Sequence, residues 1–264
     1  MPTVQTNGIE TAYTDQGQGD GPPVVLIHGF PYNKSMWDDQ VAALSGSHRV
    51  ITYDLRGHGD SGATNETYTM EMLAEDLHIL VEELSLGEVA LGGFSMGGYV
   101  ALAFAAAYPE HLDSLMLLDT RHLPDTEQAA EGRENLAKQV EADGVGGLAE
   151  ALPARMLTEA TVNGKPDVVA KASDMIRAAS PEGVAGAARG MAVRRDQTDT
   201  LGSIHVPTLI VVGDQDGITP PVDAQAMADA IYNSTLVTIA DASHLSNLDK
   251  PDEFNRALVD FLSS

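Results

Sequence analysis

Residues 88–104 read EVALGGFSMGGYVALAF, and this stretch decides the fold. Its apolar start and alanine-rich end predict a strand, a tight turn and a helix, with Ser95 at the turn in the pattern G-x-S-x-G. Glycines at 93 and 97 suit so sharp a bend, because only small neighbours pack against it. The same letters also fit a glycine-rich turn with an incidental serine. The strand before and the helix after favour a serine whose Oγ is exposed as a nucleophile.

Outside this stretch, short apolar runs alternate with helical patterns along most of the chain. Such alternation predicts right-handed crossovers and a mainly parallel sheet with helices on both faces. A hairpin is expected to open the chain, because Gly8 separates two short β-like runs. We therefore predict an α/β fold with an eight-stranded sheet, its strands near residues 3–7, 10–14, 24–27, 49–54, 89–91, 115–118, 206–212 and 235–240.

Residues 121–195 interrupt this alternation. The segment is rich in alanine and acidic residues, is broken by several glycines and prolines, and holds no strong apolar strand. It predicts short helices inserted over the mouth of the sheet, at the carboxyl ends of the strands where sites of such sheets collect. A separate domain is the alternative, but the sheet pattern resumes afterwards. We expect a core of residues 1–120 and 196–264 with a small helical cap at 121–195.

Acidic residues dominate the charge: 39 Asp and Glu against 15 Lys and Arg give a formal net charge of −24. Such a surface repels phosphate backbones and anionic membranes, so neither a nucleic acid nor a membrane is expected as a partner. The acids are scattered along the chain rather than gathered in a tail, which indicates a folded body coated with charge. The pattern is typical of proteins adapted to high salt, where screening relieves the repulsion; an ordinary acidic protein is the alternative.

The N-terminus and the cysteine count bear on location. The chain has no cysteine, hence no disulfide, thiolate nucleophile or cysteine-type zinc site. Its first residues show neither the basic start nor the apolar core of a secretory signal. No apolar run approaches the roughly 20 residues that span a membrane. These features favour a cytoplasmic protein.

A serine nucleophile needs a base, and the base needs an orienting carboxylate. His244 follows the last expected strand and Asp216 follows the strand before it, which gives the chain order Ser, Asp, His. His244 would take the hydroxyl proton of Ser95 and return it to the leaving group. From the residues alone the acid stays open, because Asp214 lies in the same loop as Asp216 and Asp119 follows the strand after Ser95.

Two backbone amides are candidates to bind a developing oxyanion. The amide of Met96 is free at the start of a helix, where the dipole favours negative charge. The loop after the first buried strand offers the amide of Phe30, whereas Pro31 has no N–H to donate. No pair of histidines lies four apart on a helix and no G-x-x-x-x-G-K loop occurs, so neither a metal nor a cofactor is expected.

Over nearly its whole length the chain resembles proteins of the α/β-hydrolase fold. The resemblance implies catalytic roles for Ser95, Asp216 and His244, with the amides of Phe30 and Met96 as oxyanion donors. Within that fold it is similar to cofactor-free haloperoxidase and perhydrolase-type esterases and to 3-oxoadipate enol-lactonases. The stretches that carry it are VVLIHGFP (24–31), YDLRGHGDS (53–61), GGFSMGG (92–98), VPTLIVVGDQDGITP (206–220) and ASHLSNLDKPDEF (242–254).

The resemblance implies a hydrolase of carboxylic esters with small or medium acyl chains, acting through an acyl-enzyme on Ser95. It also implies side reactivity with hydrogen peroxide. A lactonase of the enol-lactonase type is the alternative. It would act on an anionic substrate and so need a cation near the site. A non-catalytic ligand-binding member of the fold is a third hypothesis. The cations available in or beside the insertion are Arg121, Arg189, Arg194 and Arg195.

Overall fold

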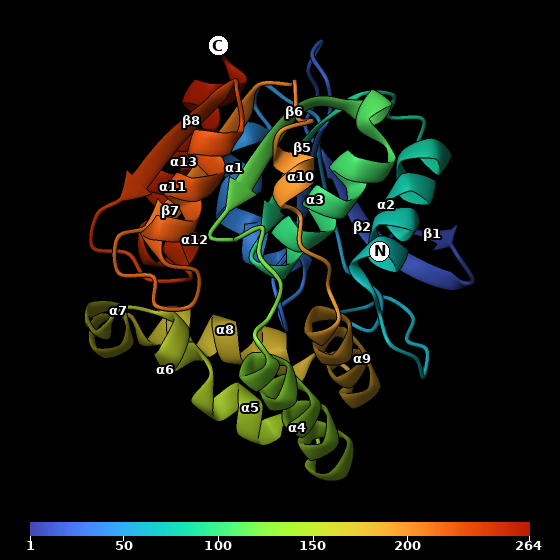
Figure 1. The fold of residues 1–264 in the computed structure, drawn as a ribbon, viewed down its shortest axis with the longest axis vertical. Coiled ribbons are helices and arrows are strands. Elements are labelled where there is room, and N and C mark those ends of the chain that lie inside the picture. Colours follow the sequence, from blue (N-terminus) through green and yellow to red (C-terminus); the bar gives the residue numbers. More distant parts are fainter.

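A computed structural model describes all 264 residues and contains one eight-stranded sheet in the order β1-β2-β4-β3-β5-β6-β7-β8 (Figure 1). Strand β2 pairs antiparallel with β1 and β4, and the other neighbours pair parallel. The predicted mainly parallel sheet is confirmed. Its strands are β1 (Thr3–Thr6), β2 (Ile9–Gln16), β3 (Val24–Ile27), β4 (Val50–Tyr53), β5 (Val89–Phe94), β6 (Leu112–Leu118), β7 (Thr208–Gly213) and β8 (Ser234–Ile239).

The central strands are apolar on both sides because helices cover both faces of the sheet. Every residue of β3, β4, β5 and β7 is buried, as expected for strands of a covered parallel sheet. The edge strand β8 has mostly half-buried or exposed residues. Two apolar clusters, one on each face, form the core.

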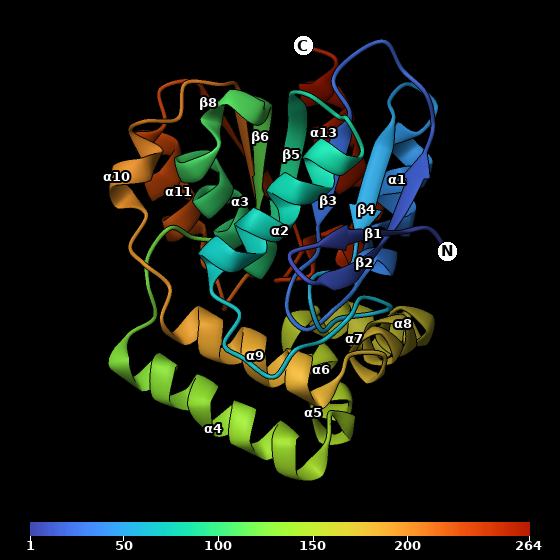
Figure 2. The same ribbon diagram turned by 90° about the vertical axis from the view of Figure 1, so that its right-hand side faces the viewer.

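The helices divide between the two faces of the sheet (Figure 2). On one face, Trp37 is buried and packs edge-on against Phe94 of β5, in the role of a packing residue. That face carries η1 (Lys34–Trp37), α1 (Asp38–Leu44), α12 (Ser246–Asp249) and α13 (Pro251–Leu262). The other face carries α2 (Met70–Glu83), α3 (Met96–Ala107), α10 (Thr198–Leu201) and α11 (Pro221–Ala230).

Six helices between β6 and β7 form a separate layer, drawn at the bottom of Figures 1 and 2, next to the carboxyl ends of the parallel strands. They all fall within residues 121–195, and no strand occurs among them. The layer joins the core in part through α9, whose Gly186 carbonyl accepts a hydrogen bond from the amide of Tyr68. The six are α4 (Glu127–Asp143), α5 (Gly146–Ala151), α6 (Pro153–Met156), α7 (Glu159–Gly164), α8 (Pro166–Arg177) and α9 (Pro181–Ala192).

Two short helices flank the strands without a clear sequence pattern. The loop after β8 runs into the short helix α12, all four residues of which are buried. Four residues are too few for a helical pattern to be visible in sequence, so tertiary contacts determine this helix. A short turn of helix, η2 (Pro109–His111), precedes β6. None of the helices combines the length and the apolar composition that crossing a membrane requires.

Candidate active site

Ser95 sits at the strained turn between β5 and α3. Its backbone has φ of 52° and ψ of −113°, a conformation that side chains with a Cβ rarely adopt. The turn is tight enough that a Cβ at Gly93 would collide with the carbonyl oxygen of Gly97. A Cβ at Gly97 would lie 2.5 Å from the carbonyl oxygen of Ile27. The flanking glycines are therefore required by contact, and the turn presents the Ser95 side chain at the end of β5.

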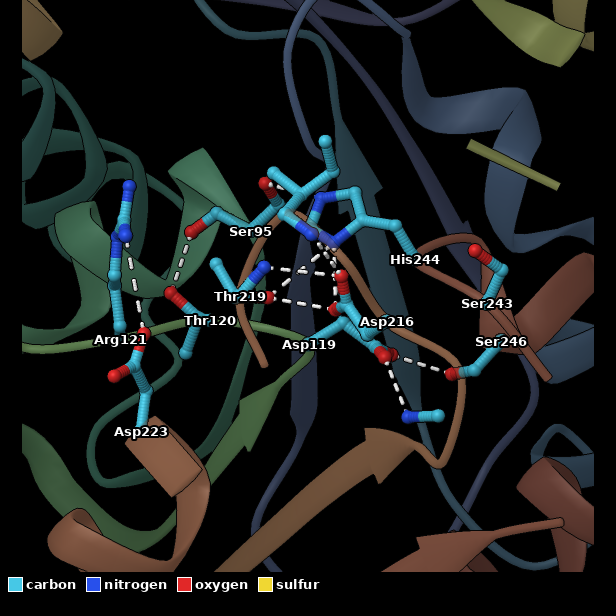
Figure 3. Close-up of polar contacts among 12 residues, drawn as sticks. Ser95, Asp119, Thr120, Arg121, Asp216, Thr219, Asp223, Ser243, His244 and Ser246 are labelled. Carbon is cyan, nitrogen blue, oxygen red and sulfur yellow. Dashed lines mark hydrogen bonds and ion pairs between the residues drawn. The ribbon is translucent and has the colours of Figure 1, made fainter. Parts of the chain in front are cut away.

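His244 and Asp216 complete a hydrogen-bonded chain with Ser95 (Figure 3). The Nε2 atom of His244 lies 2.9 Å from the Oγ of Ser95, and its Nδ1 lies 2.8 Å from Oδ2 of Asp216. His244 and Asp216 are both buried. Because a carboxylate accepts hydrogen bonds, Nδ1 carries the proton and Nε2 is free to accept the serine hydroxyl proton. Three loops, after β5, β7 and β8, bring these groups together.

The carboxylate of Asp216 is held by its own turn. Its Oδ1 accepts hydrogen bonds from the amides of Ile218 and Thr219, and the hydroxyl of Thr219 donates to Oδ2 at 2.7 Å. Burial by itself would raise the pKa of Asp216, but hydrogen bonds and charge from His244, with the bonds from Thr219, bring that pKa below its ordinary value. Asp216 is therefore charged at neutral pH. Thr219 was not expected at the site from the sequence, although an aspartate whose side chain accepts the amide two residues on is a common turn signal.

The two other candidate acids have different partners. Asp119 accepts hydrogen bonds from the amide of Gly213, at 2.9 Å, and from the hydroxyl of Ser246. Burial, reinforced by the nearby charge of Asp216, raises the pKa of Asp119 well above its ordinary value. Asp214 accepts a hydrogen bond from the amide of Ala242 at 3.3 Å. Of the three acids, only Asp216 reaches His244.

The candidate oxyanion donors lie on segments in direct contact. The close approach of Gly97 to the end of β3 packs the first turn of α3 against the segment that carries Phe30. Met96 is the first residue of α3, where a helical amide has no partner within the helix. Neither the Met96 amide nor the Phe30 amide has an acceptor among the turn, loop and cap hydrogen bonds, as a candidate oxyanion donor requires.

A buried histidine fixes the loop that carries Phe30. The Nε2 atom of His28 accepts a hydrogen bond from the amide of Leu55 at 2.9 Å, and its Nδ1 lies 2.9 Å from the Gly29 carbonyl oxygen. Burial, together with the neighbouring His58, lowers the pKa of His28 well below its ordinary value. This neutral ring joins two loops at the carboxyl ends of β3 and β4, so its role is structural.

The cations considered for an anionic substrate are mostly paired with acids. Arg189 pairs with two glutamates of α4, and Arg194 is buried against Asp125 at 2.6 Å. Arg195 is 80% exposed and lies 3.3 Å from Glu71. Arg121 has only two long contacts, 3.8 Å each, to Asp125 and Asp223, and its Nε atom is buried without a partner. Figure 3 draws the pair formed with Asp223.

Known proteins resemble the chain over nearly its whole length. A family model described as alpha/beta hydrolase fold matches residues 22–251. A 3-oxoadipate enol-lactonase of Acinetobacter baylyi is 30% identical over 97% of this chain and 94% of that protein. A putative non-heme chloroperoxidase of Synechocystis sp. is 31% identical over 96% of this chain and 95% of that protein. The malate-bound structure of a thermophilic esterase from Thermogutta terrifontis superposes with a TM-score of 0.95, at 43% identity over 99% of this chain and 97% of that one.

Proposed function

The chain belongs to the alpha/beta hydrolase fold family, and we propose that it is a serine hydrolase that cleaves carboxylic esters of small or medium acyl chains. One observation carries the proposal: an unbroken hydrogen-bonded chain joins the Oγ of Ser95 to His244 and then to Asp216. The similarity to an esterase structure at 43% identity supports the choice of ester substrates. Ser95 is the nucleophile, His244 the base and Asp216 the orienting acid.

In the first half of the reaction, Ser95 attacks the ester carbonyl carbon while His244 Nε2 accepts the hydroxyl proton. We assign the amides of Phe30 and Met96 as the donors to the oxyanion of the tetrahedral intermediate, a role supported by their lack of an acceptor among the turn, loop and cap hydrogen bonds. When the intermediate collapses, the C–O bond to the alcohol breaks. His244 returns its proton to the departing oxygen, and the acyl group remains on Ser95.

In the second half, water repeats the same steps. His244 accepts a proton from the water as it attacks the acyl carbon, and then returns that proton to Ser95 as the acid departs. Asp216 carries charge throughout, because its pKa lies below the ordinary value, and so stabilises the imidazolium formed in each half. Hydrogen peroxide in place of water gives a peracid, the side reaction that the haloperoxidase-like resemblance implies.

The pairing of the arginines supports neutral esters over carboxylate-bearing lactones. Arg189 and Arg194 are bound to acids of the chain, so an anionic substrate would have to compete with those acids. A lactonase remains the second candidate, because a lactone is a cyclic ester cleaved by the same steps. It is favoured by the long contacts of Arg121 and by the relative named as an enol-lactonase.

A non-catalytic role would leave the Ser95 geometry without a purpose. The strained turn, the bond to His244 and the two free amides all serve acyl transfer, and a binding protein needs none of them. The intact arrangement therefore supports an enzyme.

The test is hydrolysis of a chromogenic short-chain ester by wild type, Ser95→Ala and a control, Ser243→Ala. Ser243 lies next to His244 and its hydroxyl makes only one long contact, 3.4 Å to the Gln215 carbonyl oxygen, so its removal should leave the rate unchanged. The Ser95→Ala variant should lose about 10⁶-fold in kcat, as for loss of a serine nucleophile in a comparable arrangement. Similar rates in wild type and Ser95→Ala would refute the mechanism.

Ester and lactone substrates are separated by Arg121→Gln, with exposed Arg195→Gln as the matched control. If the substrate is a neutral ester, Arg121→Gln should change kcat/KM by the same factor for the ester and for a carboxylate-bearing lactone. A loss confined to the anionic lactone would establish the lactonase instead.

A further inference from the structure

Three side chains of types that can bind metals form a cluster far from Ser95. His78 and Glu82 stand on α2, and His111 ends η2, just after α3. One donor atom from each of the three lies within 4.8 Å of the others. Ser95 is at the start of α3 and η2 follows its end, so the helix of 12 residues, about 18 Å long, separates the two places. The cluster is therefore not part of the esterase machinery.

Two of the donors share one face of a helix. His78 and Glu82 are four residues apart on α2, which places their side chains one above the other. Helix α2 packs against α3, and this brings His111 beside them from the far end of α3. The sequence signal for this pair is a histidine followed four residues later by a glutamate, rather than two histidines at that spacing.

The ring of His111 has the orientation that metal ligation requires. Its Nδ1 lies 3.4 Å from the carbonyl oxygen of Gly87, which can only accept, so Nδ1 carries the proton. Its Nε2 then holds a lone pair and lies 3.6 Å from Oε1 of Glu82. Metal-binding histidines commonly donate their other N–H to a backbone carbonyl in this way, which fixes the tautomer.

Stacking holds the ring of His78 in place. It lies flat against Tyr108, with ring centroids 4.1 Å apart and planes inclined by 7°, and its centroid is 5.0 Å from that of His111. The Nδ1 atom of His78 is buried and has no hydrogen-bond partner. A buried polar atom without a partner costs free energy, and a metal bound to Nδ1 would offset that cost.

We propose that His78, Glu82 and His111 form a Zn²⁺ site, with water as the fourth ligand. Two imidazole nitrogens and one carboxylate suit zinc and not Ca²⁺ or Mg²⁺, which prefer oxygen ligands only. Ligands of tetrahedral zinc lie about 3.3 Å apart, given bond lengths of about 2.0–2.1 Å. Glu82 is 61% exposed, so its side chain has the freedom to close the remaining distance.

The bound metal would cross-link α2 and η2. The metal would join the last turn of α2 to the turn that leads into β6, and the chain's net charge of −24 raises the local concentration of any cation. Because the three ligands come together only in the folded state, bound Zn²⁺ stabilises the fold by mass action.

The test is calorimetric titration of the metal-free protein with Zn²⁺, in excess Mg²⁺ so that diffuse cation binding is saturated. Wild type should bind one Zn²⁺, and a hundredfold excess over Kd should raise Tm by roughly 5 °C. Co²⁺ in place of Zn²⁺ should give the visible absorption of a tetrahedral site. Binding should weaken at least tenfold in Glu82→Gln and in His111→Asn.

The matched controls are Glu83→Gln, an exposed carboxylate next to Glu82, and His205→Ala, an exposed histidine elsewhere; both should bind zinc as wild type does. Absence of saturable binding overturns the proposal, and so does equal binding in wild type, Glu82→Gln and His111→Asn. Zinc that is lost with His244→Ala and inhibits ester hydrolysis also overturns it. The titration uses no substrate, so its outcome is independent of the proposed esterase activity.

Discussion

The buried carboxylate of Asp249 binds Thr158, the residue that caps α7 in the layer of helices α4–α9. The amide of Thr158 lies 3.2 Å from each carboxylate oxygen of Asp249, and the hydroxyl lies 3.0 Å from Oδ1. Oδ2 of the same carboxylate also accepts a hydrogen bond from the amide of Ser243 at 2.9 Å. Ser243 directly precedes His244, so one carboxylate joins the α4–α9 layer to the loop that carries the candidate base.

We expect Asp249→Asn to disturb this junction, because an amide has only one accepting oxygen and turns a donor toward one of the two backbone amides. The variant should lose about 1–3 kcal/mol of unfolding free energy, as for a buried donor left without its partner. Misplacement of His244 should also lower kcat by about tenfold or more. Chemical denaturation and steady-state kinetics check both effects.

The control is Asp241→Asn, an exposed carboxylate in the loop that carries His244, whose contact with Lys250 is 3.9 Å long. It should change neither quantity. Wild-type kcat in Asp249→Asn would show that the position of His244 does not depend on this carboxylate.

Asp119 predicts a pH-dependent cost of folding. Burial and the neighbouring Asp216 raise the pKa of Asp119 in the folded state, so the folded chain holds a proton that the unfolded chain releases as the pH rises. This group therefore lowers stability progressively from the ordinary carboxyl pKa up to its raised value. Asp119→Asn removes that titration and keeps an oxygen for the amide of Gly213, and the hydroxyl of Ser246 can turn to accept.

Denaturation of wild type and Asp119→Asn across a pH series measures the difference. The free energy of unfolding of the variant should increase relative to that of wild type as the pH rises above the ordinary carboxyl pKa. A difference that stays constant with pH would mean that Asp119 folds with an unperturbed pKa.

The acidic surface predicts a salt-dependent melting temperature. With 39 acidic and 15 basic residues, repulsion among the excess carboxylates opposes folding, and salt screens it. Tm should rise as potassium chloride increases into the molar range, measured by calorimetry. The rise should shrink near the isoelectric point, where the net charge is small. A flat or falling Tm at neutral pH would argue for an ordinary acidic protein.

Local patterns were sufficient to predict the strands, the turn at Ser95 and the chain order of the candidate residues. The G-x-S-x-G pattern constrains the backbone by contact between neighbouring segments, and buried parallel strands are continuous apolar runs. The choice between Asp216 and Asp119 did not follow from the residues alone. That choice depends on which loop reaches His244. Asp119 instead accepts a hydrogen bond from Ser246, on the short helix α12.

Contacts between distant segments were beyond local patterns. From the sequence, Arg194 was a candidate cation for binding an anionic substrate. In the structure it is buried against Asp125, which precedes α4 in the chain, whereas Arg194 follows α9. The bond between Asp249 and Thr158 likewise joins the core to that layer; Asp249 lies in the 242–254 stretch, but nothing in that stretch points to Thr158. Such pairs depend on how the helices pack, which spacing along the chain does not encode.

The proposed ester hydrolysis depends most on Ser95 being a nucleophile activated by His244 across 2.9 Å. Reaction with a fluorophosphonate probe, followed by mass spectrometry of the intact protein and its peptides, tests this directly. We predict one adduct per chain, located on Ser95, absent in Ser95→Ala and formed far more slowly in His244→Ala. An adduct on another residue, or equal labelling of wild type and His244→Ala, would contradict the account.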